Sequence, residues 1–111
     1  DVLTLAGLPD ATFDLVVDNH CAHCIVGPAD RAAFWASARR VLKPGGLMFT
    51  TMMSAEGAFD RPARVTPEGN RFWVLEAELR TELAAAGFTV LHLARIPDPP
   101  HGDDLVAYLK G

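Results

Sequence analysis

Four side chains that could do chemistry stand within five residues of one another: His20, Cys21, His23 and Cys24. A histidine titrates near neutral pH, so His20 or His23 could serve as a base or contact a substrate beside a reacting atom. The Cys-x-x-Cys spacing is half of a zinc site, but a closed site needs four ligands and the sequence holds no second cysteine pair. Ordinary burial of the cysteines is the third interpretation. The residue types alone leave all three open.

Two polar residues, Asp18 and Asn19, come just before this cluster and directly after the apolar run Phe13–Val17. In doubly wound α/β sheets, ligands bind outside the carboxyl ends of the strands, where these two side chains would lie. The alternative is that Asp18 only caps the turn that follows it.

Short apolar runs predict four strands, over residues 13–17, 47–53, 88–96 and 105–109, and the first two are expected to be buried on both faces. Helical spacing predicts one helix that begins after a cap at Asp30 and stops at Pro44-Gly45-Gly46. A second helix carries Leu75, Leu79 and Leu83 and ends at Gly87. This alternation predicts an α/β sheet of parallel strands, and the short last connection makes the final strand antiparallel.

Composition narrows the class of protein. The chain has 111 residues, half of them hydrophobic, which suits one small globular domain. Its formal charge of −4 gives no electrostatic footprint for nucleic acid or for an anionic membrane surface. The apolar runs are far shorter than the roughly 20 residues of a membrane span. Two closely spaced cysteines cannot staple a fold, so we expect a cytoplasmic protein.

The joint spacing of several motifs resembles the middle of a class I S-adenosylmethionine-dependent methyltransferase of the type 11/25-like kind. The family pattern has an acidic residue ending a strand, a Leu-Pro turn, Phe-Asp-Leu-Val, a loop with His, a helix with Arg-Arg-Val-Leu, then Lys-Pro-Gly-Gly and later Ala-Gly-Phe. Here these are Asp1, Leu8-Pro9, Phe13–Val16, His23, Arg39–Leu42, Lys43–Gly46 and Ala86–Phe88.

The resemblance implies that residues 1–111 are the C-terminal half of a Rossmann-like doubly wound domain, from family strand four to strand seven. The Gly-rich loop and the acidic residue that hold the cofactor in the family are absent from the sequence. We therefore expect a fragment, inactive alone, of an enzyme that transfers a methyl group from S-adenosylmethionine to an unknown acceptor, expected to be a small molecule. The alternative is a non-catalytic half-domain that pairs through the open edge of strand 13–17, with a missing N-terminal segment or with a second copy.

The resemblance also assigns site residues. It implies that Asp1, Val2, Asp18, Asn19 and His23 contact the cofactor, with the Asp1 carboxylate accepting from the adenine amino group. It makes His23 the first catalytic candidate, and His20 is the second. It implies no metal ligand.

The loop-like stretch 54–70 lies where the family admits its substrate. Its arginines, Arg61 and Arg64, could meet a substrate carboxylate. The alternative is that both are solvated surface residues.

Overall fold

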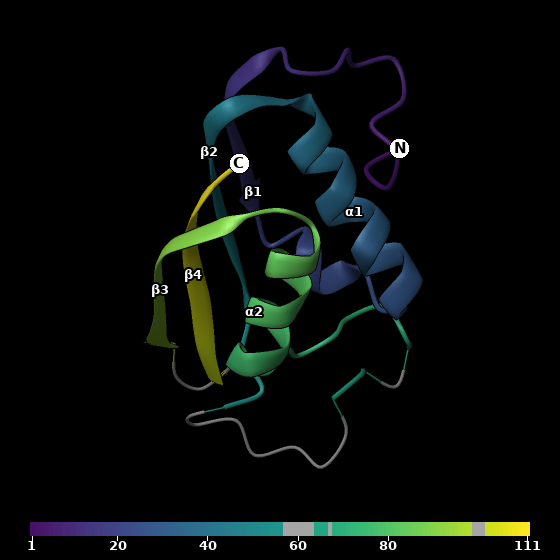
Figure 1. Cartoon of the computed structure of the whole chain (residues 1–111). Coiled ribbons are helices and arrows are strands. Elements are labelled where there is room, and N and C mark those ends of the chain that lie inside the picture. The colour runs from purple at the N-terminus through teal and green to yellow at the C-terminus, as the bar shows by residue number, and fades with distance from the viewer. Residues whose placement is uncertain (57–63, 67, 99–101) are drawn as a thin grey trace.

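The computed structural model describes residues 1–56, 64–66, 68–98 and 102–111. Figure 1 shows the predicted strands and helices in the predicted order. The elements are β1 (Phe13–Asn19), the short 3-10 helix η1 (Ala22–Cys24), α1 (Pro28–Val41), β2 (Leu42–Met53), α2 (Glu76–Ala85), β3 (Thr89–Asp98) and β4 (Gly102–Lys110). No helix in these residues is long and apolar enough to cross a membrane.

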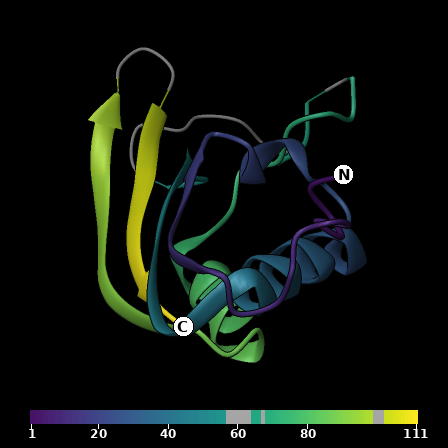
Figure 2. The same cartoon turned by 90° about the horizontal axis from the view of Figure 1, so that it is seen from above.

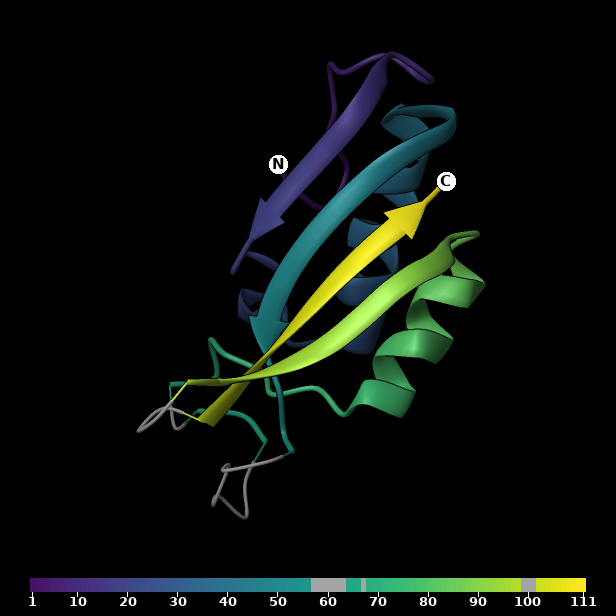
Figure 3. The same cartoon turned by 90° about the vertical axis from the view of Figure 1, so that its left-hand side faces the viewer.

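The four strands form one sheet in the order β1-β2-β4-β3. β1 and β2 run parallel, and β4 lies antiparallel between β2 and β3. The prediction of an antiparallel final strand is therefore confirmed, and so is the α/β class with its Rossmann-like arrangement. Figure 3 looks onto the sheet from the side away from the helices.

Helix α1 begins earlier than predicted. Its N-cap is Gly27 and Pro28 occupies the first turn, whereas the sequence pattern had placed the cap at Asp30. Proline suits this position because the first amide groups of a helix have no intrahelical acceptor, so its missing N–H costs nothing. Asp30 instead lies in the first turn, where its negative charge is favourable to the helix dipole.

Strand β2 begins at Leu42, before the predicted start at residue 47. Leu42 pairs with Phe13, the register then shifts, and regular pairing resumes where Leu47 faces Leu15. Residues 43–46 therefore bulge from the ladder. A Cβ on Gly46 would lie 2.9 Å from the backbone oxygen of Lys43, so this position of the bulge requires glycine.

The core lies on one side of the sheet. Figure 2 shows α1 and α2 on the same side, and the side chains between them and the strands are fully buried. The largest of these are Trp35, Leu42, Met48, Met52, Leu79, Leu83, Leu105 and Leu109.

The opposite side, here called the bare face, is apolar and uncovered. It is formed by Leu15, Val17, Leu47, Phe49, Leu91 and Tyr108, which line a shallow hollow of about 320 Å³. Leu15 is 57% exposed and Val17 61%. The prediction that the first two strands are buried on both faces is therefore wrong, because both helices cover the same face. β1 is also an edge strand, paired within the described residues only to β2.

Candidate functional site

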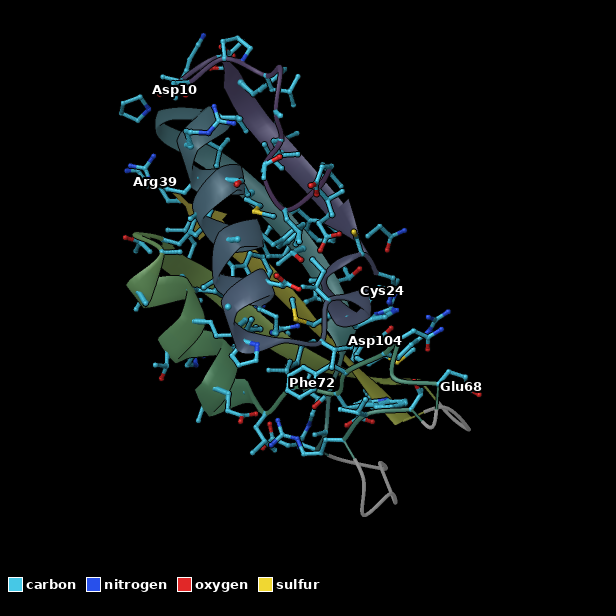
Figure 4. The ribbon with its side chains drawn as sticks, turned by 90° about the vertical axis from the view of Figure 1, so that its right-hand side faces the viewer. Asp10, Cys24, Arg39, Glu68, Phe72 and Asp104 are labelled. Atoms are coloured by element: carbon cyan, nitrogen blue, oxygen red, sulfur yellow. The ribbon has the colours of Figure 1, made fainter. Side chains whose placement is uncertain are left out.

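The chemically interesting residues meet at one end of the sheet. The carboxyl ends of β1 and β2 lie here, and because β4 is antiparallel, its first residues arrive at the same end. Figure 4 labels Cys24 of η1, Phe72 of the segment before α2 and Asp104 of β4, which gather in this region. The amide of Phe72 donates to the backbone oxygen of His23 over 2.7 Å, which ties that segment to η1.

The carboxylate of Asp18 is buried and organises the turn into η1. It accepts hydrogen bonds from the amides of Cys21 at 3.0 Å and Ala22 at 3.3 Å. It also accepts from the Thr50 hydroxyl on the neighbouring strand at 2.6 Å. These contacts are those of a turn cap, so Asp18 shapes the site through the backbone that it holds.

Of the predicted cofactor residues Val2, Asn19 and Asp1, Val2 lines a hollow and the other two do not. Val2 lies with Asp18 and Cys21 around a hollow of about 170 Å³ between the N-terminal segment, β1 and α1, here called the β1 hollow. Asn19 accepts a hydrogen bond from the Thr51 hydroxyl at 2.8 Å. Asp1 is exposed, its carboxylate accepts from the amide of Leu3, and it does not line the hollow.

His20 is held at the end of β1 in a strained conformation. Its φ is +63°, in the left-handed region that non-glycine residues rarely adopt, and such strain often marks functional sites. The imidazole is 40% exposed, and its Nε2 lies 3.8 Å from a carboxylate oxygen of Asp104. The site therefore contains an accessible imidazole beside an acid.

His23 has a different environment. It is buried, its ring centre lies 5.2 Å from that of His20, and its Nδ1 has no hydrogen-bond partner within the described part of the chain. Burial is the main cause that lowers the pKa of His23 to about 4, and Coulombic repulsion from His20, Arg71 and Arg31 adds to it. His23 is therefore neutral at physiological pH.

The two cysteines are free thiols. Burial raises the pKa of the Cys21 thiol, and the negative charge of Asp18 raises it further, so the thiolate is disfavoured. Over the residues described, no group of three or more His, Cys, Asp or Glu side chains is arranged to hold a metal ion.

Two arginines of the stretch 54–70 were predicted as possible partners of a substrate carboxylate. Arg64 pairs with Glu78 and donates to the backbone oxygen of Trp73, so its guanidinium is engaged within the chain. Arg61 lies outside the described residues.

Asp104 was not identified as a site residue from the sequence. Nothing local marks it, because its place beside His20 depends on the insertion of β4 next to β2.

Comparisons with known proteins also indicate a similarity to methyltransferases. Residues 1–50 match the family model described as a methyltransferase domain. A search of curated protein sequences returns no match.

Solved structures share the fold over nearly the whole chain. The 1,6-didemethyltoxoflavin-N1-methyltransferase of Burkholderia thailandensis, solved with 1,6-didemethyltoxoflavin and S-adenosylhomocysteine, is 28% identical with a TM-score of 0.79, over 98% of this chain and 47% of that one. A methyltransferase of Methanosarcina mazei is 18% identical with a TM-score of 0.77, over 99% and 64%. A [4+2]-cyclase is 17% identical with a TM-score of 0.75, over 99% and 53%.

The chain thus spans less than two-thirds of the length of each of these proteins. The likeness to the cyclase shows the fold alone, and one fold can host several reactions. Over residues 1–50 the chain is similar to a methyltransferase domain, and over nearly its whole length its fold is that of S-adenosylmethionine-dependent methyltransferases.

Proposed function

We propose that this chain is the C-terminal part of an enzyme that transfers a methyl group from S-adenosylmethionine to a small-molecule acceptor. The observation that carries the proposal is the 28% identity, over 98% of the chain, to a methyltransferase solved with S-adenosylhomocysteine and a small-molecule ligand. The free thiols of Cys21 and Cys24 favour a reducing compartment such as the cytoplasm.

The residues around the β1 hollow fit one end of such a cofactor. Val2, Leu5 and Val16 give apolar walls that suit a planar ring, and the buried Asp18 fixes the backbone at the floor. Asp1 and Asn19 do not line the hollow, but each carries a side-chain oxygen able to accept a hydrogen bond from a cofactor that extends beyond it. His23 borders the site as a neutral imidazole.

When bound, the cofactor supplies an electrophilic methyl group. The contribution of this chain is then to position the acceptor and to take its proton. We assign the base to His20, because its imidazole is accessible while His23 is buried. A ring nitrogen of His20 would accept the proton of the acceptor, and the carboxylate of Asp104, 3.8 Å from Nε2, would stabilise the imidazolium.

We further propose that the domain is completed by another segment. Helices on one face only, an open β1 edge and an apolar bare face leave the half-domain unfinished. A segment placed beside β1 and over the bare face would supply the rest of the cofactor site. The same surface favours the second candidate function, a half-domain that acts by association, with a second copy as the other occupant.

Isothermal titration of S-adenosylhomocysteine tests the proposal. It is titrated into this chain and into the chain joined to an N-terminal half taken from a relative. Binding only to the completed protein supports a methyltransferase whose site this chain shares. Absence of binding to both, together with association of the two parts, would favour the interaction half-domain instead.

The base assignment has its own test in the completed enzyme. His20→Gln should lower kcat by about 10²-fold or more and Asp104→Asn by less, since general-base catalysis contributes about 10²–10⁴-fold. An unchanged kcat in His20→Gln would remove His20 from the chemistry. The matched control is His92→Gln on β3, away from this end of the sheet.

A further inference from the structure

The N-terminal segment, residues 1–12, is attached to α1 by hydrogen bonds to side chains and to the backbone of that helix. The segment contains only turns ahead of β1. The Ser37 hydroxyl donates to the backbone oxygen of Leu3 at 2.6 Å, and the amide of Ala11 donates to the backbone oxygen of Arg40 at 2.9 Å. The shape of the segment is therefore set by the helix beside it.

Most of these contacts come from one guanidinium. Arg40 donates to the backbone oxygens of Leu8 at 2.9 Å, Thr4 at 3.1 Å and Leu5 at 3.2 Å. It also forms an ion pair with Asp10 at 2.6 Å. Four acceptors on one side chain define a single geometry for the segment, which a lysine with its compact charge could not reproduce.

The backbone that Arg40 holds is strained. Leu5 has a φ of +47° and Ala11 a φ of +49°, and neither is a glycine. Such conformations cost about 1–3 kcal/mol each and persist only where surrounding contacts enforce them. The segment would therefore relax to another shape without its anchor.

The anchored segment is one wall of the β1 hollow. Val2 and Leu5 face Val16 and Asp18 across it, whereas Arg40 itself does not line it. Figure 4 shows Asp10 at the end of the molecule where α1 finishes, away from Cys24 and Asp104. A change at Arg40 thus reaches the hollow only through the segment.

We propose that Arg40 is a positioning residue for the cofactor, which fixes the wall made by Val2 and Leu5 without touching the ligand. The proposal rests on the proposed function, because it takes the β1 hollow to be part of the cofactor site. It adds a requirement that the resemblance did not supply, namely that cofactor affinity depends on a side chain outside the hollow.

The test compares Arg40→Met and Arg40→Lys with Arg39→Met in the completed enzyme. Arg39 is the matched control, since it packs near Gly87 and Gly111 instead of the segment. We expect Arg40→Met to weaken S-adenosylhomocysteine binding about tenfold and to raise the cofactor KM with kcat unchanged, as for lost binding that is equal in ground and transition states. Arg40→Lys should restore part of the affinity, and Arg39→Met should leave it unchanged.

Hydrogen exchange separates this proposal from the proposed function. The amides of Leu5 and Leu8, bonded to Asp1 and Leu5 oxygens, should exchange at least several-fold faster in Arg40→Met. Equal affinities in the Arg40→Met and Arg39→Met proteins, or a fall in kcat at constant KM, would overturn the positioning role. A wild-type protein that binds no S-adenosylhomocysteine would overturn the proposed function, and unchanged exchange would overturn the anchoring itself.

Discussion

The covered face and the bare face of the sheet carry similar residues in different surroundings. Met48 and Leu105 on the covered face are at most 1% exposed, while Leu15, Val17 and Leu91 on the bare face are more than half exposed. A sheet adapted to water on one side alternates apolar and polar residues. Here the outward positions remain apolar, so the bare face has the composition of an interior without the cover of one.

The largest difference between the faces should appear on truncation of a core leucine. Leu79→Ala truncates a fully buried side chain of α2 and should lower the free energy of unfolding by about 2–5 kcal/mol. Leu15→Ala, the matched change on the bare face, should cost less than about 0.5 kcal/mol. Urea denaturation of both variants measures this, and equal costs would mean that the two faces are alike in solution.

A smaller loss of stability is expected when the ion pair between α1 and α2 on the covered side is removed. Arg31 is buried, forms a two-pronged ion pair with Glu82 and donates to the backbone oxygens of Ala22 and Ile25. Arg31→Met should cost about 2–3 kcal/mol, because it leaves these acceptors without their donor. Its control, Arg80→Met, breaks the exposed pair with Glu76 and should change stability by less than about 0.5 kcal/mol.

The covered side should also make stability depend on pH. The pKa of His23 is about 4 in the folded chain and 6.5 when unfolded, so the unfolded state takes up the proton first as the pH falls. Stability is complete above pH 6.5 and is lost towards pH 4, by on the order of 3 kcal/mol. Denaturation across this window should show the loss in the wild type. A His23→Gln variant with the same pH dependence would contradict the assignment.

The smallest effect on the chain itself should come from a charge on the bare face. Val17→Lys places an ammonium where the side chain is already 61% exposed, so stability should change by less than about 0.5 kcal/mol. Association with a covering segment should weaken much more, since a lysine would then be buried without a partner. Sedimentation with the N-terminal half of a relative measures this, and undiminished association would place the cover elsewhere.

Local pattern predicted the elements well and the placement of side chains less well. The apolar runs and the Leu75, Leu79 and Leu83 spacing gave the strands and α2, because these signals are set by residues close in sequence. The N-cap of α1 was predicted at Asp30, but the helix begins at Pro28, because proline is favoured in the first turn of a helix. Burial of β1 and β2 on both faces was expected because their residues are apolar. Apolar residues show that a strand is suited to burial, but not whether this chain itself covers both faces.

The site was predictable only where it follows a strand end. Asp18 and the His20–Cys24 cluster lie at the carboxyl end of β1 as expected, since strand direction alone determines this. The proximity of Asp104 to His20 and the hold of Arg40 on the N-terminal segment depend on contacts far apart in sequence. The cofactor roles of Asp1, Val2, Asp18, Asn19 and His23 remain predictions.

The position of β4 has a consequence for the synthesis of the protein. β4 comes last of the four strands in sequence, yet it lies between β2 and β3 and pairs with both of them. Until residues 102–110 have been synthesised, β3 has no neighbouring strand of this sheet with which to pair. The sheet can therefore be completed only after β4 has emerged. The pairing of β4 with β2 joins residues distant in sequence, and such pairing is intrinsically slow. The emergence of β4, not that of the helices, would then time the completion of this sheet.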